Sequence, residues 1–139
     1  MFLPLNEDPF NWFIDGAKLF ELRKNHRQWT EKHIYRGRRV EIRLGYSGPR
    51  AYSAWGTIGD VRLADCISEL FRWKISWRDV LPYCSSEAEA TDMAVNMLDL
   101  PGWYVDEPLI CFQIILDENY IGMSESNLKD ILKKSEREG

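Results

Sequence analysis

A glycine that ends a short helical pattern and is followed at once by a strand restricts most strongly how this chain can fold. Residues 9–14 are apolar and aromatic and predict a short helix, with acidic residues at 7 and 8 near its start. Gly16 then allows the backbone a positive φ and a sharp turn. The pattern predicts that the helix ends at Gly16 and that a strand covers 19–24.

Three ionisable residues, Lys18, Glu21 and Arg23, lie beside this turn among apolar neighbours, and this indicates a site. Side chains alternate in a strand, so Lys18 meets Glu21 only if it lies within the turn. Burial would lower the pKa of the Lys18 amine, and the carboxylate would raise it. Alternatively, Glu21 and Arg23 form an ion pair that orders a cleft wall, and Lys18 is an exposed phosphate ligand.

The remaining elements predict an α+β domain. Alternation predicts a strand over 39–44 with Val40, Ile42 and Leu44 inward, and glycines within the strand over 55–63 indicate a bulge or barrel corner. A helix is expected after Ser85 or Ser86, a central apolar strand over 109–116 and a charged helix over 127–137. This order suits a curled sheet with flanking helices. The apolar stripe expected on the helix after Ser86 is Ala88, Met93, Ala94, Met97 and Leu98.

Length and composition indicate one domain with a substantial core. The chain has 139 residues, is 45% hydrophobic and contains six each of Trp, Tyr and Phe. We expect a single domain over 1–116 and a charged helical extension over 117–139. No apolar run is long enough to span a bilayer, and residues 2–5 lack the basic start of a signal peptide. We therefore expect no membrane partner.

The cysteines and histidines do not predict a metal site. Cys66, Cys84 and Cys111 are odd in number and widely spaced, which is typical of buried free thiols in a reducing compartment. We therefore expect a cytoplasmic protein. His26 and His33 are too far apart to be ligands on one helical turn, and the sequence contains no G-x-S-x-G, P-loop, H-E-x-x-H or Cys/His pair. We expect no cofactor.

The charge distribution is strongly asymmetric. Residues 18–50 contain ten basic and three acidic residues, a net charge of +7, whereas the whole chain is −4 and the remainder is therefore −11. This pattern indicates either a basic face that binds nucleic acid or basic residues that pair with the acidic part of the fold. Aromatic residues among the cations could stack on bases or fill the core. These aromatic residues are Trp29, Tyr35, Tyr46 and Tyr52.

The spacing G-x-K-x-x-E-x-R at Gly16, Lys18, Glu21 and Arg23 resembles the motif of the ASCH domain family. The resemblance covers residues 9–63 and 109–116, and residues 64–104 align poorly. The flanking matches are Pro9, Trp12, Gly37, Val40 and Ile42, together with the later strand over 56–63.

The resemblance implies a PUA-like curled β-barrel with flanking short helices and a cleft beside the motif, at which family members bind RNA or nucleotides. Some small members resemble amidohydrolases that deacylate N4-acylated cytidine. In that case Lys18 would be the nucleophile or base and Glu21 its motif partner, a position that those enzymes fill with threonine. They also use a later acid, for which Glu69, Glu87 and Glu89 are candidates.

Three functional hypotheses follow. The first is a module that binds RNA or a modified nucleoside or nucleotide, with Lys18 and Glu21 reading a base or sugar edge. The second is the amidohydrolase, and the third is a protein-interaction module that docks through the acidic half and the tail. The oligomeric state stays open. In the first hypothesis the phosphate contacts come from Arg23, Lys24, Arg27, Arg36, Arg38, Arg39 and Arg43.

Overall fold

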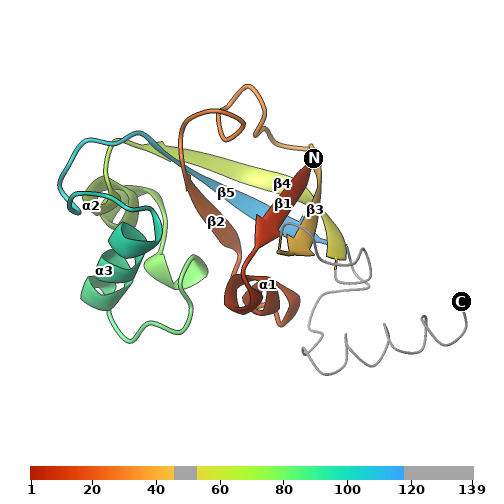
Figure 1. The fold of residues 1–139 in the computed structure, drawn as a ribbon, viewed down its shortest axis with the longest axis horizontal. Coiled ribbons are helices and arrows are strands. Elements are labelled where there is room, and N and C mark those ends of the chain that lie inside the picture. Colours follow the sequence, from red (N-terminus) through yellow and green to blue (C-terminus); the bar gives the residue numbers. More distant parts are fainter. Residues whose placement is uncertain (46–52, 118–139) are drawn as a thin grey trace, which may run out of the picture.

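A mixed five-stranded sheet organises the protein, whose computed structural model describes residues 1–45 and 53–117. Its strands are β1 (Phe2–Leu5), β2 (Phe20–Lys24), β3 (Arg39–Leu44), β4 (Ser53–Ala64) and β5 (Leu109–Leu116). Their order across the sheet is β1-β3-β4-β5-β2, and only the β1–β3 pair is parallel. The sheet is curled, as Figure 1 shows, and this confirms the predicted α+β fold class.

Short helices flank the sheet. They are α1 (Glu7–Ile14), α2 (Ile67–Glu69), the π-helical turn η1 (Leu70–Lys74), the 3-10 turn η2 (Trp77–Asp79) and α3 (Glu87–Met97). Figure 1 shows α2 and α3 together at one end of the sheet, beside the ends of the long strands β4 and β5, and α1 below β1 and β2. Ser86 caps α3, because its side chain accepts a hydrogen bond from the Glu89 backbone N–H.

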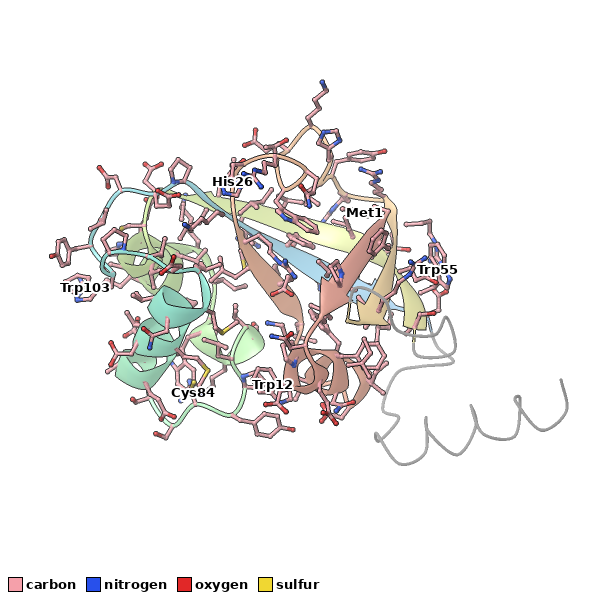
Figure 2. The ribbon with its side chains drawn as sticks, viewed as in Figure 1. Met1, Trp12, His26, Trp55, Cys84 and Trp103 are labelled. Atoms are coloured by element: carbon pink, nitrogen blue, oxygen red, sulfur yellow. The ribbon has the colours of Figure 1, made fainter. Side chains whose placement is uncertain are left out.

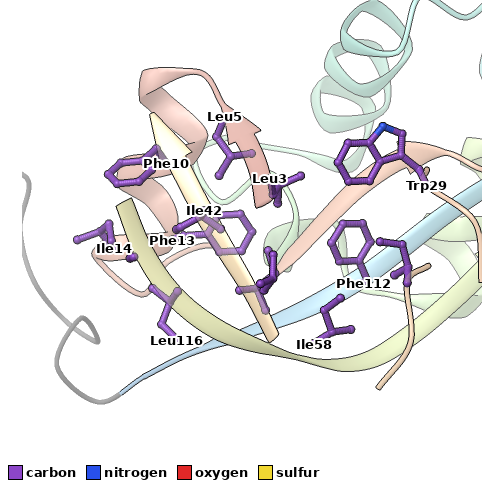
Figure 3. Close-up of a cluster of buried hydrophobic side chains, with 14 of the residues drawn as sticks. Leu3, Leu5, Phe10, Phe13, Ile14, Trp29, Ile42, Ile58, Phe112 and Leu116 are labelled. Carbon is purple, nitrogen blue, oxygen red and sulfur yellow. The ribbon is translucent and has the colours of Figure 1, made fainter. Parts of the chain in front are cut away.

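Two hydrophobic clusters pack against the two faces of β5, which lies between β4 and the edge strand β2. Alternate residues of a strand point to opposite faces, so β5 contributes Phe112 to one cluster and Cys111 to the other. The first cluster lies between the sheet and α1 and includes Leu3, Phe10 and Trp29 (Figure 3). The second joins β2 and β5 to the helical region from α2 to α3. Burial on both faces accounts for the apolar run over 109–112, whereas Gln113 and the 50% exposed Ile115 lie further along, where one face is less covered.

Several sequence predictions are confirmed. The first helix and the 39–44 strand occur as expected, and Val40 and Ile42 are buried. Gly16 has φ +82°, the positive value that the turn requires. Strand β4 shifts register against β5 between Ile58 and Val61, which is the bulge that its glycines indicated. Cys84 and Cys111 are buried free thiols, whereas Cys66 is partly exposed.

Two predictions about elements need correction. The sequence did not predict β1, which runs parallel to β3 and places Leu3 opposite Ile42. The apolar stripe on α3 was wrong in part, because Met93 and Met97 are exposed while Ala90 and Ala94 face the core. Small alanines, rather than methionines, allow α3 to approach its neighbours closely.

Parts of the predicted organisation lie outside the described residues. These parts are the helix over 127–137, all but Asp117 of the expected extension, and the residues Tyr46, Arg50 and Tyr52. The proposed division at residue 116 therefore stays a prediction. Within 1–45 and 53–117, no helix has the length and apolar character that crossing a bilayer demands.

Candidate functional site

The turn at Gly16 directs Lys18 into the protein. Helix α1 gives way to this turn at Asp15, and the Lys18 backbone N–H donates to the Trp12 carbonyl at 2.9 Å. The next residue, Leu19, donates to the Asp79 carbonyl at 2.8 Å and so fastens the turn to η2. Lys18 therefore lies before the regular pairing of β2, as contact with Glu21 requires.

The Lys18 ammonium is enclosed. The residue is 2% exposed, and its Nζ donates to the Val80 carbonyl at 2.6 Å. Nζ also lies 3.7 Å from Glu21 Oε1 and 5.4 Å from the centre of the Phe13 ring. Burial lowers the pKa of this amine, while the Glu21 carboxylate acts to raise it. The interpretation of Lys18 as an exposed phosphate ligand is wrong.

The segment that supplies the Val80 carbonyl is held against α1. Trp12 of α1 and Tyr83 pack with ring centres 5.6 Å apart, and the Tyr83 hydroxyl donates to Asp15 Oδ2 at 3.1 Å. Figure 2 shows Trp12 beside this segment, near Cys84. The polar partner of Lys18 therefore comes from a part of the chain that the motif resemblance does not cover.

Glu21 forms the centre of a charged triad in which Lys18 and Glu21 are buried and Arg23 is partly exposed. It is 3% exposed, and its Oε1 accepts a hydrogen bond from the Leu22 backbone N–H at 2.9 Å. Its Oε2 lies 3.4 Å from Arg23 Nη2, so one carboxylate is placed between two cations, Lys18 and Arg23. The structure thus brings together the three ionisable residues of the motif.

A pocket of about 250 Å³ opens beside the triad, and we call it the motif pocket. Glu21 and Arg23 border it, and Lys18 does not. The pocket has two sets of walls, one from the β1–α1 junction and one from the end of α3. Its full lining is Pro4, Leu5, Asn6, Pro9, Glu21, Leu22, Arg23, Gly45, Met97 and Leu98.

Arg23 connects the motif pocket to a neighbouring hollow. Its Nη2 donates to the Pro4 carbonyl at 3.1 Å, and its guanidinium lies 4.7 Å from the centre of the Trp29 ring. Pro4 and Trp29 both border the neighbouring hollow of about 390 Å³, which we call the second groove. Its lining is Met1, Phe2, Pro4, Gln28, Trp29, His33 and Arg38.

Most of the predicted phosphate ligands pair with acids of the same chain. Lys24 lies 3.9 Å from Glu107, Arg36 pairs with Asp60, Arg39 lies 2.7 Å from Asp117, and Arg43 lies 2.5 Å from Glu41. The pairing of Arg39 with Asp117 lowers the pKa of that carboxyl. Internal pairing of the basic segment, one of the two interpretations of the charge pattern, therefore accounts for these four residues.

Arg38 and Arg27 differ from those four residues. Among residues 1–45 and 53–117, neither has an acidic partner within ion-pair distance. Arg38 Nη1 donates to the His33 carbonyl at 2.6 Å and borders the second groove. Arg27 has a positive φ of 56° and an exposed side chain. The structure therefore does not gather the seven predicted phosphate ligands in one cleft: Arg23 borders the motif pocket and Arg38 the second groove.

The candidate later acids lie elsewhere. Glu69 accepts from the Asp65 backbone N–H at 3.0 Å and lies 4.0 Å from Lys74. Glu89 accepts from the Ser85 backbone N–H at 2.9 Å, and Glu87 borders a different hollow beside α3. None of the three borders the motif pocket.

The structure also shows where the predicted aromatic and histidine residues lie. Trp29 is 9% exposed and belongs to the core, so its main role is packing. Tyr35 is exposed, and its ring centre lies 5.7 Å from the Arg38 guanidinium. His33 borders the second groove, and the residues that the structure describes contain no group of three metal-ligating side chains.

Sequence reasoning missed the apolar walls of the motif pocket. Pro4 and Leu5 come from the unpredicted strand β1, and Met97 and Leu98 come from the end of α3. Met97 was assigned to the core, yet it is 50% exposed. No local pattern marks these residues, because they reach the pocket only through the parallel β1–β3 pairing and the packing of α3.

Comparison with known proteins supports the fold and nothing finer. No family model and no curated protein matches the chain. The crystal structure of the hypothetical protein PH0355 has a TM-score of 0.63 at 16% identity, over 84% of this chain and 97% of its own. The solution structure of PF0455 from Pyrococcus furiosus has a TM-score of 0.56 at 17% identity, over 84% and 96%.

A crystal structure of a ZmASCH variant from Zymomonas mobilis is more distant, with a TM-score of 0.49 at 14% identity, over 94% of this chain and 77% of its own. The assignment of the fold does not depend on it. The curled mixed sheet with short flanking helices is shared with the PH0355 and PF0455 structures, which supports the predicted α+β fold.

Proposed function

We propose that the protein binds RNA or a modified nucleotide and that one base enters the motif pocket. The observation that carries this proposal is the Glu21 carboxylate, held between Lys18 and Arg23 at the edge of a small pocket with apolar walls. A few fixed polar groups inside an apolar hollow are typical of small-ligand sites. The volume of about 250 Å³ suits a group the size of a base.

The chemistry of the triad defines what the pocket can recognise. A carboxylate only accepts hydrogen bonds. Glu21 therefore selects a group that donates, such as the exocyclic amino group of cytosine. Pro4, Leu5 and Leu98 offer apolar surface to the faces of a flat ring.

The placement of Lys18 favours binding over amide hydrolysis. A nucleophilic amine must reach the carbonyl carbon of its substrate, but Nζ is enclosed and does not border the motif pocket. The electrostatic attraction between the Lys18 ammonium and the Glu21 carboxylate instead holds the carboxylate in place. Lys18 thus acts as a positioning residue for Glu21.

The test is a calorimetric titration with the four ribonucleosides and with short single-stranded RNA. Glu21→Gln should weaken binding of the amino-bearing nucleosides about tenfold or more, because a hydrogen bond to a charged group contributes roughly 1.5–3 kcal/mol. Glu69→Gln is the matched control, since Glu69 is an acid outside the pocket, and it should bind like the wild type.

A second variant avoids the charged triad. Met97→Glu adds a negative charge at the pocket wall and should weaken binding of nucleotides more than of nucleosides. Nucleosides and RNA that fail to bind the wild type at millimolar concentration would contradict the proposal, as would unchanged affinity in both variants. Turnover of N4-acetylcytidine by the wild type, lost in Lys18→Arg, would instead establish the amidohydrolase.

A further inference from the structure

The second groove has the composition of a site for a second nucleotide. Phe2 is 45% exposed at its border, which is unusual for a phenylalanine. The Arg43 guanidinium lies 4.4 Å from the centre of the Phe2 ring, and the exposed part of the ring is open to a ligand. Gln28 and His33 add side chains that can form hydrogen bonds. An aromatic surface beside polar side chains is how single-stranded nucleic acid is commonly bound.

Arg38 supplies an uncompensated cation to this groove. Its neighbours in sequence, Arg36 and Arg39, each pair with an aspartate. Arg38 lacks an acidic partner among the residues that the structure describes, and one of its nitrogens, Nη1, donates to the His33 carbonyl. A guanidinium has five N–H donors, so most of those on Arg38 can still donate to phosphate oxygens.

The second groove adjoins the motif pocket. Pro4 borders both, and Arg23 of the motif pocket lies against Trp29 of the second groove, 4.7 Å from its ring centre. The hydrogen bond from Arg23 to the Pro4 carbonyl fixes the wall between the two hollows. The two hollows therefore share Pro4 as a common wall and lie side by side.

We infer that the ligand is a single strand whose adjacent nucleotides occupy the motif pocket and the second groove, with a phosphate at Arg38. This inference rests on the proposed function and restricts it, because a free nucleoside would fill only the motif pocket. The base at Glu21 is selected by its donor group, whereas the nucleotide at Phe2 and Arg38 is held by stacking and charge and is therefore selected weakly.

The experiment compares each of the four nucleoside 5′-monophosphates with the corresponding 5′-phosphorylated ribodinucleotide by calorimetry. The dinucleotide should bind roughly fivefold or more tightly, since stacking one base typically contributes 1–3 kcal/mol. Its affinity should also fall more steeply with salt, because it carries one more phosphate.

Two variants test whether the tighter binding of the dinucleotide comes from the second groove. Arg38→Gln should remove most of the dinucleotide advantage, and Gln28→Ala, at an exposed position, should reduce it without affecting folding. Arg36→Gln is the matched control, because Arg36 borders neither hollow, and it should retain the advantage. Mononucleotides that bind as well as dinucleotides, or an advantage that survives both groove variants, would overturn this inference while the proposed function stands. Failure of every nucleotide to bind would overturn both.

Discussion

At the scale of single residues, Lys18 couples the stability of the protein to pH. Its pKa is lowered in the folded protein from the ordinary value of 10.5, chiefly by burial. The unfolded chain therefore holds more protons in the window below 10.5, and folding becomes more favourable as pH rises through that window. The stability of the wild type relative to Lys18→Met should increase as pH rises towards about 10.5, as measured by urea unfolding.

The Cys111 thiol acts in the opposite direction and must be separated from this effect. Burial raises its pKa from 9.0 to about 12, so this group lowers stability as pH rises from about 9 to 12. Both proteins keep Cys111, so its contribution largely cancels in the difference. At neutral pH Lys18→Met should cost about 2 kcal/mol, since Glu21 loses one buried partner and keeps Arg23. A pH-independent difference would contradict the shifted pKa.

The residues of the motif could be predicted to meet, but their surroundings could not. The turn at Gly16 and the spacing of the three ionisable groups place Lys18 near Glu21 from local sequence alone. Complete burial of Lys18 depends on the Val80 carbonyl, which lies 62 positions further along the chain. No periodicity within residues 16–24 carries that information.

At the scale of elements, the turn between α1 and β2 is the most sensitive connection. Gly16 has φ +82°, and an added Cβ would meet nothing within 4 Å, so any cost of substitution is conformational. Gly16→Ala should destabilise the protein by roughly 1 kcal/mol, measured by urea unfolding, because residues with a Cβ are disfavoured at positive φ.

Gly16→Asn distinguishes the cost of the positive φ from other effects of adding a side chain at this position. Asparagine tolerates the left-handed region better than alanine, so this variant should lose less stability although its side chain is larger. Equal losses in the two variants would show that positive φ is not the cause. Equal stability of all three proteins would show that the turn does not constrain the fold.

Elements with strong local patterns were predictable, and those that depend on partners were not. Strand β3 alternates charged and apolar residues, and its predicted bounds match the structure. Strand β1 has four residues including Pro4, and only the parallel pairing with β3 makes it a strand. On α3, Ala90 and Ala94 form the buried face, whereas the methionines are exposed. Methionine is more hydrophobic than alanine, so hydrophobicity alone predicts the wrong face.

At the scale of the whole molecule, the basic segment is largely neutralised within the fold. The described cations of this segment without an acidic partner within ion-pair distance are Arg27, Lys32 and Arg38. Each neutralised phosphate of a single strand contributes about −0.7 to the slope of log affinity against log salt. If each of these three cations neutralises one phosphate, we expect a slope near −2. The measurement is a titration of a short single-stranded RNA between about 50 and 500 mM salt.

A much steeper slope would mean that the internal ion pairs open when RNA binds. In that case Arg39→Gln, which removes the pair with Asp117, should flatten the slope. If the pairs stay closed, the same variant should leave the slope unchanged, since Arg39 is already neutralised. The net charge of the sequence alone could not separate these cases, because ion pairing depends on contacts between distant residues.

The position of β2 at the sheet edge determines when the site can form. Among the strands that the structure describes, its only neighbour is β5, and Glu21 lies opposite Phe112 in their antiparallel register. During synthesis the motif leaves the ribosome before β5, the strand that fixes it. The proposed ligand site can therefore form only after β5 has been made, and a nascent chain that stops before residue 109 carries the motif without that site.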